Sequence, residues 1–260
     1  MSRVVPPYPE GKSLLAGKTV VVTAAAGTGI GFWVARRAVE EGATVLISDL
    51  HERRLRETQA KLAELTGQKC PTVLCDVTQQ EQVERLRAAA LAELGRVDVL
   101  INNAGLGGTA KLVELTDALW SKILDVTLTG TMRVTRAFLP HMLERRSGAI
   151  VNNASVVGWR AQAGQSAYAA AKAGVMAFTR CVAMEAAEAG VRVNAVAPSL
   201  AMHEFLSKVT PDGLLEELEQ REAFGRAAAP FEVANVMLFL ASDHASYLTG
   251  EVISVSSQHP

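Results

Sequence analysis

Short runs of apolar residues alternate along the chain with longer stretches that have helical periodicity. Each short run is rich in Val, Ile and Leu and lacks the strict alternation of polar and apolar residues that marks a half-exposed strand. Such a run is typical of a strand whose two faces are both buried. The predicted strands are residues 19–23, 44–48, 72–75, 97–101, 149–153, 191–195 and 252–255.

The stretches between these runs repeat apolar residues every three to four positions, as amphipathic helices do. Most are followed by glycine, which favours the end of a helix. Buried strands that alternate with helices predict an α/β fold. We therefore expect a Rossmann-like, doubly wound, parallel seven-stranded sheet with helices on both faces. The predicted helices are residues 30–41, 52–65, 79–94, 117–145, 166–188 and 231–242.

A single domain accounts for this pattern. Residues 1–16 lack periodicity and are predicted to be a flexible N-terminal arm, and residues 17–260 are predicted to form one Rossmann-fold domain. Residues 199–226 interrupt the alternation with a long connection that contains the turn Pro211-Asp-Gly213. Because long connections in compact domains are often lids, a substrate lid is predicted there, with a purely structural excursion as the alternative.

Composition and charge exclude several classes of protein. The 260 residues are 49% hydrophobic with a net charge of -1, which gives no field to attract nucleic acid or an anionic membrane. No signal peptide opens the chain, and no run of about eighteen apolar residues follows. We therefore expect a cytoplasmic protein that binds neither membrane nor nucleic acid. The five histidines and three cysteines lack the spacing of metal ligands, so no metal site is expected.

Candidate catalytic residues lie in and before the predicted helix 166–188. Tyr168 and Lys172 are four residues apart and so share one helix face. A free tyrosine titrates near roughly pH 10, and a fixed neighbouring cation lowers that pKa, so the pair is typical of a phenol that acts as general acid and base. A Tyr-x-x-x-Lys pair alone is a weak signal. Its context strengthens it, because Ser155 follows a predicted buried strand and would present its hydroxyl to the same helix.

A glycine-rich loop at residues 23–31, Thr-Ala-Ala-Ala-Gly-Thr-Gly-Ile-Gly, connects the first predicted strand to the first helix. Backbone amides and a helix N-terminus in this position bind the pyrophosphate of a dinucleotide. Asp49 ends the second strand, where a carboxylate accepts hydrogen bonds from the adenosine ribose and repels a 2′-phosphate. We therefore predict NAD rather than NADP as the cofactor. Arg53 and Arg54 could neutralise a phosphate, but they are interpreted as helix-surface residues.

Further cofactor contacts are predicted where the third and fourth strands end. Asp76 and Val77 follow the third strand, although Asp76 is equally well interpreted as a helix N-cap. Asn103, Ala104 and Gly105 close the fourth strand with small residues that let a ribose lie close. The complete set of predicted cofactor-binding residues is Thr23, Gly27, Gly29, Ile30, Gly31, Asp49, Asp76, Val77, Asn103, Ala104, Gly105, Tyr168, Lys172 and Ser199.

Together these motifs resemble the short-chain dehydrogenase/reductase family from Lys18 onward. The resemblance implies a strand order of 3-2-1-4-5-6-7 and a homo-oligomer, with a tetramer favoured over a dimer. It also implies hydride transfer between a secondary alcohol or ketone and nicotinamide C4. In that scheme Tyr168 moves the proton, Ser155 holds the substrate oxygen, and Lys172 binds the nicotinamide ribose while lowering the pKa of the tyrosine. The matching segments are Thr23 to Gly31, Asp76, Asn102-Asn-Ala-Gly105, Ser155, Tyr168-x-x-x-Lys172 and Asn194-Ala-Val-Ala-Pro198.

The chain departs from the usual family pattern at several positions. Ala24 stands where glycine normally follows Thr23, and the glycine-rich loop is one residue longer. Thr127 stands where the family usually has an asparagine that anchors a water-mediated proton relay. Ser199 replaces a glycine, and His203 replaces a threonine that commonly meets the nicotinamide amide.

These departures, together with segments 24–31, 152–160 and 250–260, resemble one branch of the family, which oxidises a bicyclic, steroid-derived hydroxy-indanone propanoyl-CoA in actinobacterial sterol catabolism. The expected partner is therefore a small-molecule alcohol or ketone in the form of a CoA thioester. Two alternatives stay open: an NADPH-dependent reductase of 3-oxoacyl-(acyl-carrier-protein) type, and a module that senses NAD without catalysis. An apolar wall for fused rings is predicted from Leu106, Trp159, Met202, Phe205 and Leu206, with Gln165 and His203 at its rim.

Overall fold

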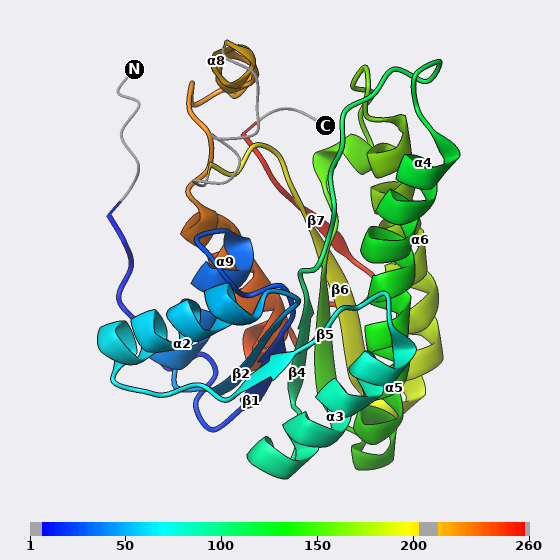
Figure 1. Ribbon diagram of the computed structural model, residues 1–260. Coiled ribbons are helices and arrows are strands. Elements are labelled where there is room, and N and C mark those ends of the chain that lie inside the picture. The colour runs from blue at the N-terminus through cyan, green and yellow to red at the C-terminus, as the bar shows by residue number, and fades with distance from the viewer. Residues whose placement is uncertain (1–6, 203–212, 258–260) are drawn as a thin grey trace.

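The computed structural model of the chain describes residues 7–202 and 213–257. They are built around a parallel sheet of seven strands in the order β3-β2-β1-β4-β5-β6-β7, as predicted (Figure 1). Helices cover both faces, which confirms the Rossmann-like fold. The strands are β1 (Thr19–Val22), β2 (Thr44–Asp49), β3 (Thr72–Leu74), β4 (Val99–Asn102), β5 (Gly148–Asn153), β6 (Val191–Pro198) and β7 (Val252–Val255).

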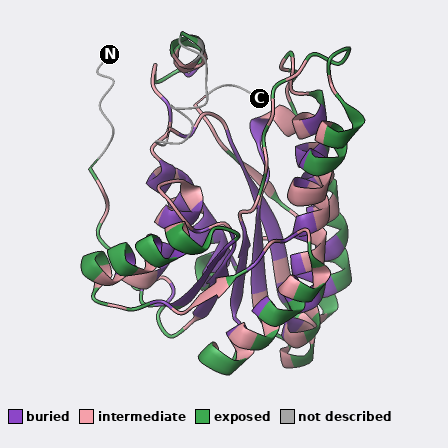
Figure 2. Cartoon of the chain, in the orientation of Figure 1, coloured by how far each residue is buried: buried purple, intermediate pink, exposed green. Residues whose placement is uncertain are grey.

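Alternate side chains of the central strands enter two hydrophobic cores, one on each face of the sheet. In β1, Val20 and Val22 pack into one core and Val21 into the other, and all three are fully buried. Successive strand residues point to opposite faces, so a sheet covered on both sides needs apolar residues at every position. Figure 2 shows the resulting buried layer of strands between the layers of helices.

The helices divide between the two faces. On one face lie α1 (Ile30–Glu40), α2 (Glu52–Thr66) and α9 (Pro230–Ala241). On the other lie α3 (Gln80–Leu94), α5 (Gly130–Arg145) and α6 (Ser166–Ala186), and α4 (Asp117–Leu124) packs beside α6. Further helical segments are the π-helix η1 (Asp125–Thr129), the short turns η2 (Val156–Gly158), η3 (Ala187–Ala189) and η4 (Asp243–Ala245), and α8 (Leu214–Gln220).

The helix predicted over residues 117–145 is present without a break, but it is not α-helical throughout. The π-helix η1 separates α4 from α5. Within η1, the hydroxyl of Thr127 accepts a hydrogen bond of 2.9 Å from the backbone N–H of Leu106, in the loop after β4. A π-turn inserts an extra residue into a helix and is frequent at functional sites. The strand β6 also extends beyond its predicted end, because it pairs with β7 as far as Pro198.

The described part of the N-terminal arm lies against α1 and α9. The ring of Tyr8 packs against Trp33 and Phe231, with centroid separations of 5.5 and 5.2 Å. Glu41, at the end of α1, accepts hydrogen bonds of 2.7 and 3.0 Å from two backbone N–H groups of the arm. Residues 7–16 are therefore fixed by specific contacts, in contrast to the flexible arm predicted for residues 1–16. The partners are distant in sequence, so no local pattern predicts them.

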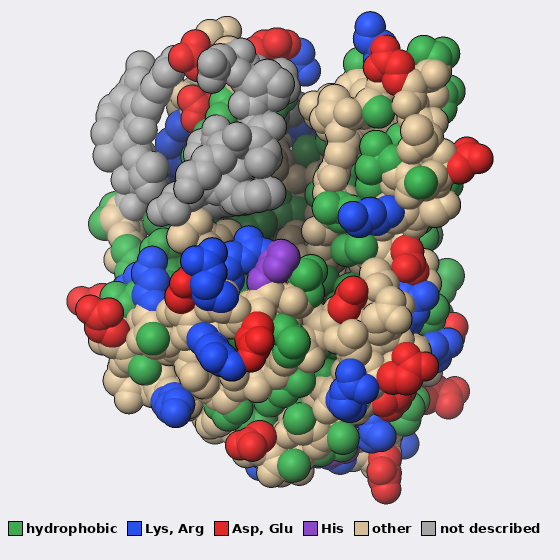
Figure 3. Space-filling model, in the orientation of Figure 1, with side chains coloured by type: hydrophobic (Ala, Val, Ile, Leu, Met, Phe, Trp, Pro, Cys, Tyr) green, Lys and Arg blue, Asp and Glu red, His purple; other side chains and the backbone are tan. Residues whose placement is uncertain are grey.

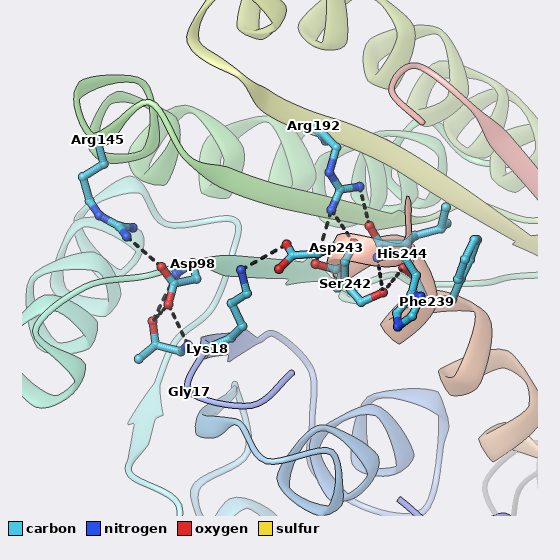
Figure 4. Close-up of polar contacts among 12 residues, drawn as sticks. Gly17, Lys18, Asp98, Arg145, Arg192, Phe239, Ser242, Asp243 and His244 are labelled. Atoms are coloured by element: carbon cyan, nitrogen blue, oxygen red, sulfur yellow. Dashed lines mark hydrogen bonds and ion pairs between the residues drawn. The ribbon is translucent and has the colours of Figure 1, made fainter. Parts of the chain in front are cut away.

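Hydrogen bonds of charged side chains connect the amino ends of the strands to neighbouring segments (Figure 4). Asp98, just before β4, accepts hydrogen bonds of 2.9 Å from the N–H of Thr19 and 2.7 Å from Arg145. Arg192 of β6 donates to backbone oxygens at the end of α9, including that of Leu240 at 2.7 Å. These contacts are structural. In open parallel sheets the carboxyl ends of the strands form the ligand site, so the functional residues are sought there.

Candidate active site

Ser155, Tyr168 and Lys172 come together at the carboxyl end of β5. Ser155 lies two residues after the end of β5 and is 8% exposed, while Tyr168 and Lys172 lie in the first turns of α6. The Nζ atom of Lys172 is 5.5 Å from the centroid of the Tyr168 ring, and the hydroxyls of Ser155 and Tyr168 are hydrogen-bonded. The tyrosine and lysine thus share one face of α6, as their spacing predicts.

Burial, rather than the neighbouring lysine, governs the pKa of Tyr168. It raises the pKa of Tyr168 to about 12, against the opposing effect of the hydrogen bond with Ser155. Burial also lowers the pKa of Lys172 to about 7. The expectation that Lys172 lowers the tyrosine pKa is therefore wrong for this structure. The lysine is only 3% exposed, and desolvation removes much of its charge near neutral pH.

A chain of amide hydrogen bonds connects Lys172 to the glycine-rich loop. The ammonium group donates to the backbone oxygen of Asn153, the last residue of β5. The Asn153 side-chain amide donates to Oδ1 of Asn103 at 2.9 Å, and Asn103 donates to the backbone oxygen of Ala24 at 3.0 Å. Asn153 is absent from the predicted site. The signal that points to it is a polar pair, Asn152-Asn153, at the end of an apolar strand.

The glycine-rich loop is attached to β2 and α2 through three successive amides. The Ala25 N–H donates to a backbone oxygen of β2 at 3.0 Å. The Ala26 N–H donates to Oδ2 of Asp49 at 3.1 Å, and the Gly27 N–H donates to Oγ1 of Thr58 at 3.0 Å. The loop amides that follow, at residues 28–30, lead into the N-terminus of α1.

The N-terminus of α1 has the features of an anion site. No side chain caps it at Gly29, and its first turn contains no acidic residue. A Cβ on Gly31 would lie 2.3 Å from the oxygen of Ala24 and 2.6 Å from Nδ2 of Asn103, so only glycine allows this close approach. Ala24 has a φ of +48°, in the region that favours the glycine usual at this position in the family.

Asp49 ends β2 and is 7% exposed. One carboxylate oxygen accepts the Ala26 N–H, and the other accepts the His51 N–H at 3.0 Å. Burial raises the pKa of Asp49, while the hydrogen bond from Ala26 and the charge of Arg54 act in the opposite direction. Each carboxylate oxygen can accept a further hydrogen bond, as recognition of ribose hydroxyls requires.

The end of β4 lies between the glycine-rich loop and Lys172. Thr23 is 1% exposed, and its Oγ1 accepts hydrogen bonds from the N–H groups of Asn103 at 3.0 Å and Ala104 at 3.2 Å. A Cβ on Gly105 would lie 3.4 Å from Nζ of Lys172. Thr23 therefore fixes the backbone of this turn, and the small residues of the turn leave space beside the lysine.

Thr127 is fully buried in η1. Its hydroxyl accepts the N–H of Leu106 at 2.9 Å and donates to the oxygen of Leu106 at 3.3 Å. Its own backbone oxygen accepts the hydroxyl of Thr131 at 2.8 Å. The hydroxyl and the backbone oxygen of Thr127, the two groups that could substitute for the family's relay asparagine, are therefore both hydrogen-bonded within the protein.

Three predicted cofactor residues make structural contacts. The Asp76 carboxylate accepts the N–H and hydroxyl of Thr78 at 2.9 and 2.8 Å, which favours its interpretation as a turn residue before α3. Val77 is 7% exposed and belongs to a hydrophobic core. Ser199 donates its N–H to the oxygen of Val255 at 3.2 Å and lines a cavity of about 160 Å³.

The predicted apolar wall is only partly described. Trp159 is 44% exposed, and Leu106 and Met202 are half-buried. Gln165 donates a 2.8 Å hydrogen bond to the loop after β4, which joins the start of α6 to that loop. Figure 3 shows a hollow in the surface at the side of the lobe that contains α4. His203, Phe205 and Leu206 lie outside the described residues.

Other potential sites are not supported in the described parts of the chain. Within residues 7–202 and 213–257, His, Cys, Asp and Glu side chains form no group that could hold a metal ion. None of the described helices combines the length and apolarity needed to cross a membrane. A cavity of about 400 Å³ lies beneath the N-terminal arm, and none of the predicted site residues lines it.

Comparison with known proteins shows that a chain with this fold and site belongs to a class of oxidoreductases. A family model described as enoyl-(acyl carrier protein) reductase matches residues 24–257. The chain belongs to the short-chain dehydrogenase/reductase family.

Individual relatives extend the match over the whole chain. The (5R,7aS)-5-hydroxy-7a-methyl-1-oxo-2,3,5,6,7,7a-hexahydro-1H-indene-carboxyl-CoA reductase of Mycobacterium tuberculosis is 59% identical over 258 residues, which cover 99% of this chain and 98% of that protein. The 3-oxoacyl-(acyl-carrier-protein) reductase of Thermotoga maritima is 40% identical over 241 residues, covering 93% and 97%. The crystal structure of a short chain dehydrogenase from Mycobacterium smegmatis matches with a TM-score of 0.88 and 54% identity, covering 99% of both chains.

Membership of the family implies a nicotinamide cofactor, and the residues of this chain fit one. The uncapped N-terminus of α1 suits a pyrophosphate. The glycine at position 31 allows the loop backbone to approach closely, and the buried Asp49 carboxylate suits a ribose. Lys172 lies next to the small residues at the end of β4, at the side of the sheet edge away from Asp49.

Proposed function

We propose that the protein is an NAD-dependent oxidoreductase that transfers a hydride between a secondary alcohol or ketone and nicotinamide. The observation that supports this most directly is the assembly of Ser155, Tyr168 and Lys172 at the carboxyl end of β5. A module that only sensed a nucleotide would have no use for a proton donor hydrogen-bonded to a second hydroxyl. The geometry therefore disfavours the non-catalytic alternative.

In the proposed mechanism, this chain moves a proton while the bound nicotinamide supplies or accepts the hydride at C4. With its pKa raised to about 12, the Tyr168 hydroxyl is protonated at neutral pH, and it donates this proton to a carbonyl oxygen as negative charge develops there. Ser155 donates a hydrogen bond to the same oxygen. Its contacts with Pro198 and Val157 are both 3.4 Å, so they are weak and easily exchanged. Oxidation of an alcohol uses the same atoms in reverse.

Lys172 is proposed to bind the nicotinamide ribose. Its ammonium group is already fixed by the backbone oxygen of Asn153. Ribose hydroxyls that accept hydrogen bonds from it favour its charged form. At the other end of the cofactor, Asp49 accepts hydrogen bonds from the adenosine ribose, and residues 28–30 bind the pyrophosphate.

We further propose a bicyclic, steroid-derived hydroxy-indanone carried as a CoA thioester as the substrate. The 59% identity to the mycobacterial indene-carboxyl-CoA reductase supports this choice. The partly exposed side chains of Trp159 and Leu106, near Ser155 and Gly105 in the sequence, offer apolar surface for fused rings. The 40% identity to a 3-oxoacyl-(acyl-carrier-protein) reductase supports the alternative of an NADPH-dependent reductase, but Asp49 disfavours a 2′-phosphate.

The test is a panel of cofactors and substrates. Hydroxy-indanone propanoyl-CoA and 3-hydroxyacyl thioesters are each offered with NAD+ or NADP+, and formation of reduced cofactor is followed by absorbance. We expect turnover of the hydroxy-indanone thioester with NAD+. Equal or faster turnover with NADP+ would refute the cofactor assignment, and turnover of only the acyl thioesters would refute the substrate assignment.

The role of Tyr168 is tested separately with Tyr168→Phe. The substitution should lower kcat by about a hundredfold to ten-thousandfold, because it removes the proton carrier. Binding of NADH, measured by calorimetry, should remain close to that of the wild type, since the ring is kept. Turnover at the wild-type rate would show that another group carries the proton.

We also propose a homo-oligomer, with a tetramer favoured, that works in the cytoplasm without nucleic acid or membrane partners. The alanine-rich surface of α6 suits close packing between subunits, and the net charge of -1 gives no attraction to polyanions. Light scattering of the purified protein measures the assembly. A monomer at micromolar concentration would refute this part of the proposal.

A further inference from the structure

We infer that Thr58 positions the glycine-rich loop for the dinucleotide and, together with Asp49, favours a cofactor that lacks a 2′-phosphate. The inference rests on the proposed use of a nicotinamide dinucleotide. Thr58 lies in the middle of α2 and is 3% exposed, on the same buried face as Leu55 and Leu62. Helical periodicity favours an apolar residue at such a position, so its buried hydroxyl needs a specific partner. That partner is the N–H of Gly27, at 3.0 Å.

Gly27 has little else to fix its conformation. Its φ is +97°, a region that L side chains rarely adopt, and a Cβ placed on it would meet nothing within 4 Å. Gly27 has no side chain to restrict its backbone, and a glycine loses more conformational entropy on ordering than any other residue. The hydrogen bond to Thr58 compensates part of that cost before any cofactor binds.

The same contact affects which dinucleotide fits. Ala26 and Gly27 are consecutive, and their N–H groups are satisfied by Asp49 and Thr58 at 3.1 and 3.0 Å. A 2′-phosphate beside Asp49 would meet a carboxylate and would find these two amide donors already engaged. A ribose hydroxyl needs no such donors, because it can donate its own hydrogen bond to the carboxylate.

The experiment compares three variants with the wild type. Thr58→Val removes the hydroxyl with little change of volume, and Thr58→Ser keeps it. Thr66→Val is the matched control, because Thr66 lies in the same helix and its hydroxyl makes only local contacts: it donates to the oxygen of Leu62 at 2.7 Å and accepts from the N–H of Gln68 at 3.3 Å. Calorimetry gives the dissociation constants for NADH and NADPH. Thermal unfolding without cofactor and kcat at saturating NAD+ report any general structural damage.

We expect Thr58→Val to weaken NADH binding by about fivefold to tenfold, the effect of losing one buried hydrogen bond. The preference for NADH over NADPH should narrow, because the Gly27 amide is released, and kcat at saturating NAD+ should stay within about twofold. Thr58→Ser and Thr66→Val should bind NADH within about twofold of the wild type. A Thr58→Val protein that binds NADH like the wild type, or a Thr58→Ser protein as weak as Thr58→Val, would overturn the inference.

A second measurement needs no variant. Hydrogen exchange of the wild type should show the Gly27 amide protected without cofactor, and exchange at the rate of an open loop would also overturn the inference. A wild-type protein that binds neither NADH nor NADPH would instead refute the proposed function. The two failures are therefore distinguishable.

Discussion

Replacing Gly31 with alanine should damage the glycine-rich loop and the stability of the protein together. The added Cβ would lie 2.3 Å from the oxygen of Ala24 and 2.6 Å from Nδ2 of Asn103. Carbon contacts are comfortable at about 3.5–4.0 Å. The two crowded atoms are themselves hydrogen-bonded at 3.0 Å, so relief requires this bond to break or α1 to move by about 1 Å.

The size of the effect follows from three contributions. Overpacking of a close contact costs about 1–3 kcal/mol, and loss of the hydrogen bond between Asn103 and Ala24 costs about 1 kcal/mol. Alanine is the better helix former, which returns up to about 1 kcal/mol at this first-turn position. The free energy of unfolding should therefore fall by about 1–3 kcal/mol. Displacement of the loop should also weaken NADH binding by about tenfold or more, because the pyrophosphate amides move with it.

Urea titration and NADH calorimetry measure the two effects. Gly107→Ala is the matched control, since a Cβ at Gly107 meets nothing within 4 Å. We expect the control to unfold and bind NADH like the wild type. If Gly31→Ala behaved like Gly107→Ala in both assays, the close packing of α1 on the loop, and with it the argument for the cofactor site, would be refuted.

Two further predictions concern pH. Burial alone would raise the pKa of Asp98, but hydrogen bonds from Thr19, Arg145 and Arg96 lower it. Asp98→Asn should therefore reduce the free energy of unfolding by about 1–3 kcal/mol at pH 7. This stabilisation is present above the unfolded pKa of roughly 3.9 and is lost as pH falls through the folded pKa, so urea titrations should show the difference closing below about pH 4. Burial lowers the pKa of Lys172 to about 7, whereas the pKa in the unfolded chain is roughly 10.4. Between these two pH values the unfolded chain binds more protons than the folded chain, so the free energy of unfolding should rise with pH. Lys172→Met should remove up to about 1.4 kcal/mol of this rise for each pH unit, and equal slopes between pH 7 and 9 in both proteins would contradict the burial of the lysine.

The parts of the site that sequence predicts correctly depend on local rules. Tyr168 and Lys172 meet because four residues make about one helical turn. Ser155 is placed because a continuous apolar run marks a buried strand that ends just before it. The last strand, β7, also has its predicted bounds.

The parts that sequence misses depend on contacts between distant segments. The π-helix η1 is held by Thr127 and Leu106, which are 21 positions apart, so the helical pattern continues through it without a break. Thr58 and Gly27 are 31 positions apart. The pKa of Tyr168 rises because segments distant in sequence partly bury it, and the spacing to one lysine contains no information about that burial.

The packing of α1 on α9 also constrains how the protein can be made. These two helices share one core, although Glu40 ends the first and Pro230 begins the second. At about 5–20 residues per second, a ribosome needs roughly 10–40 s to synthesise the intervening chain. The side of α1 that packs on α9 therefore stays uncovered by that helix through most of translation. In a nascent chain shorter than 230 residues, chaperones can bind this apolar surface.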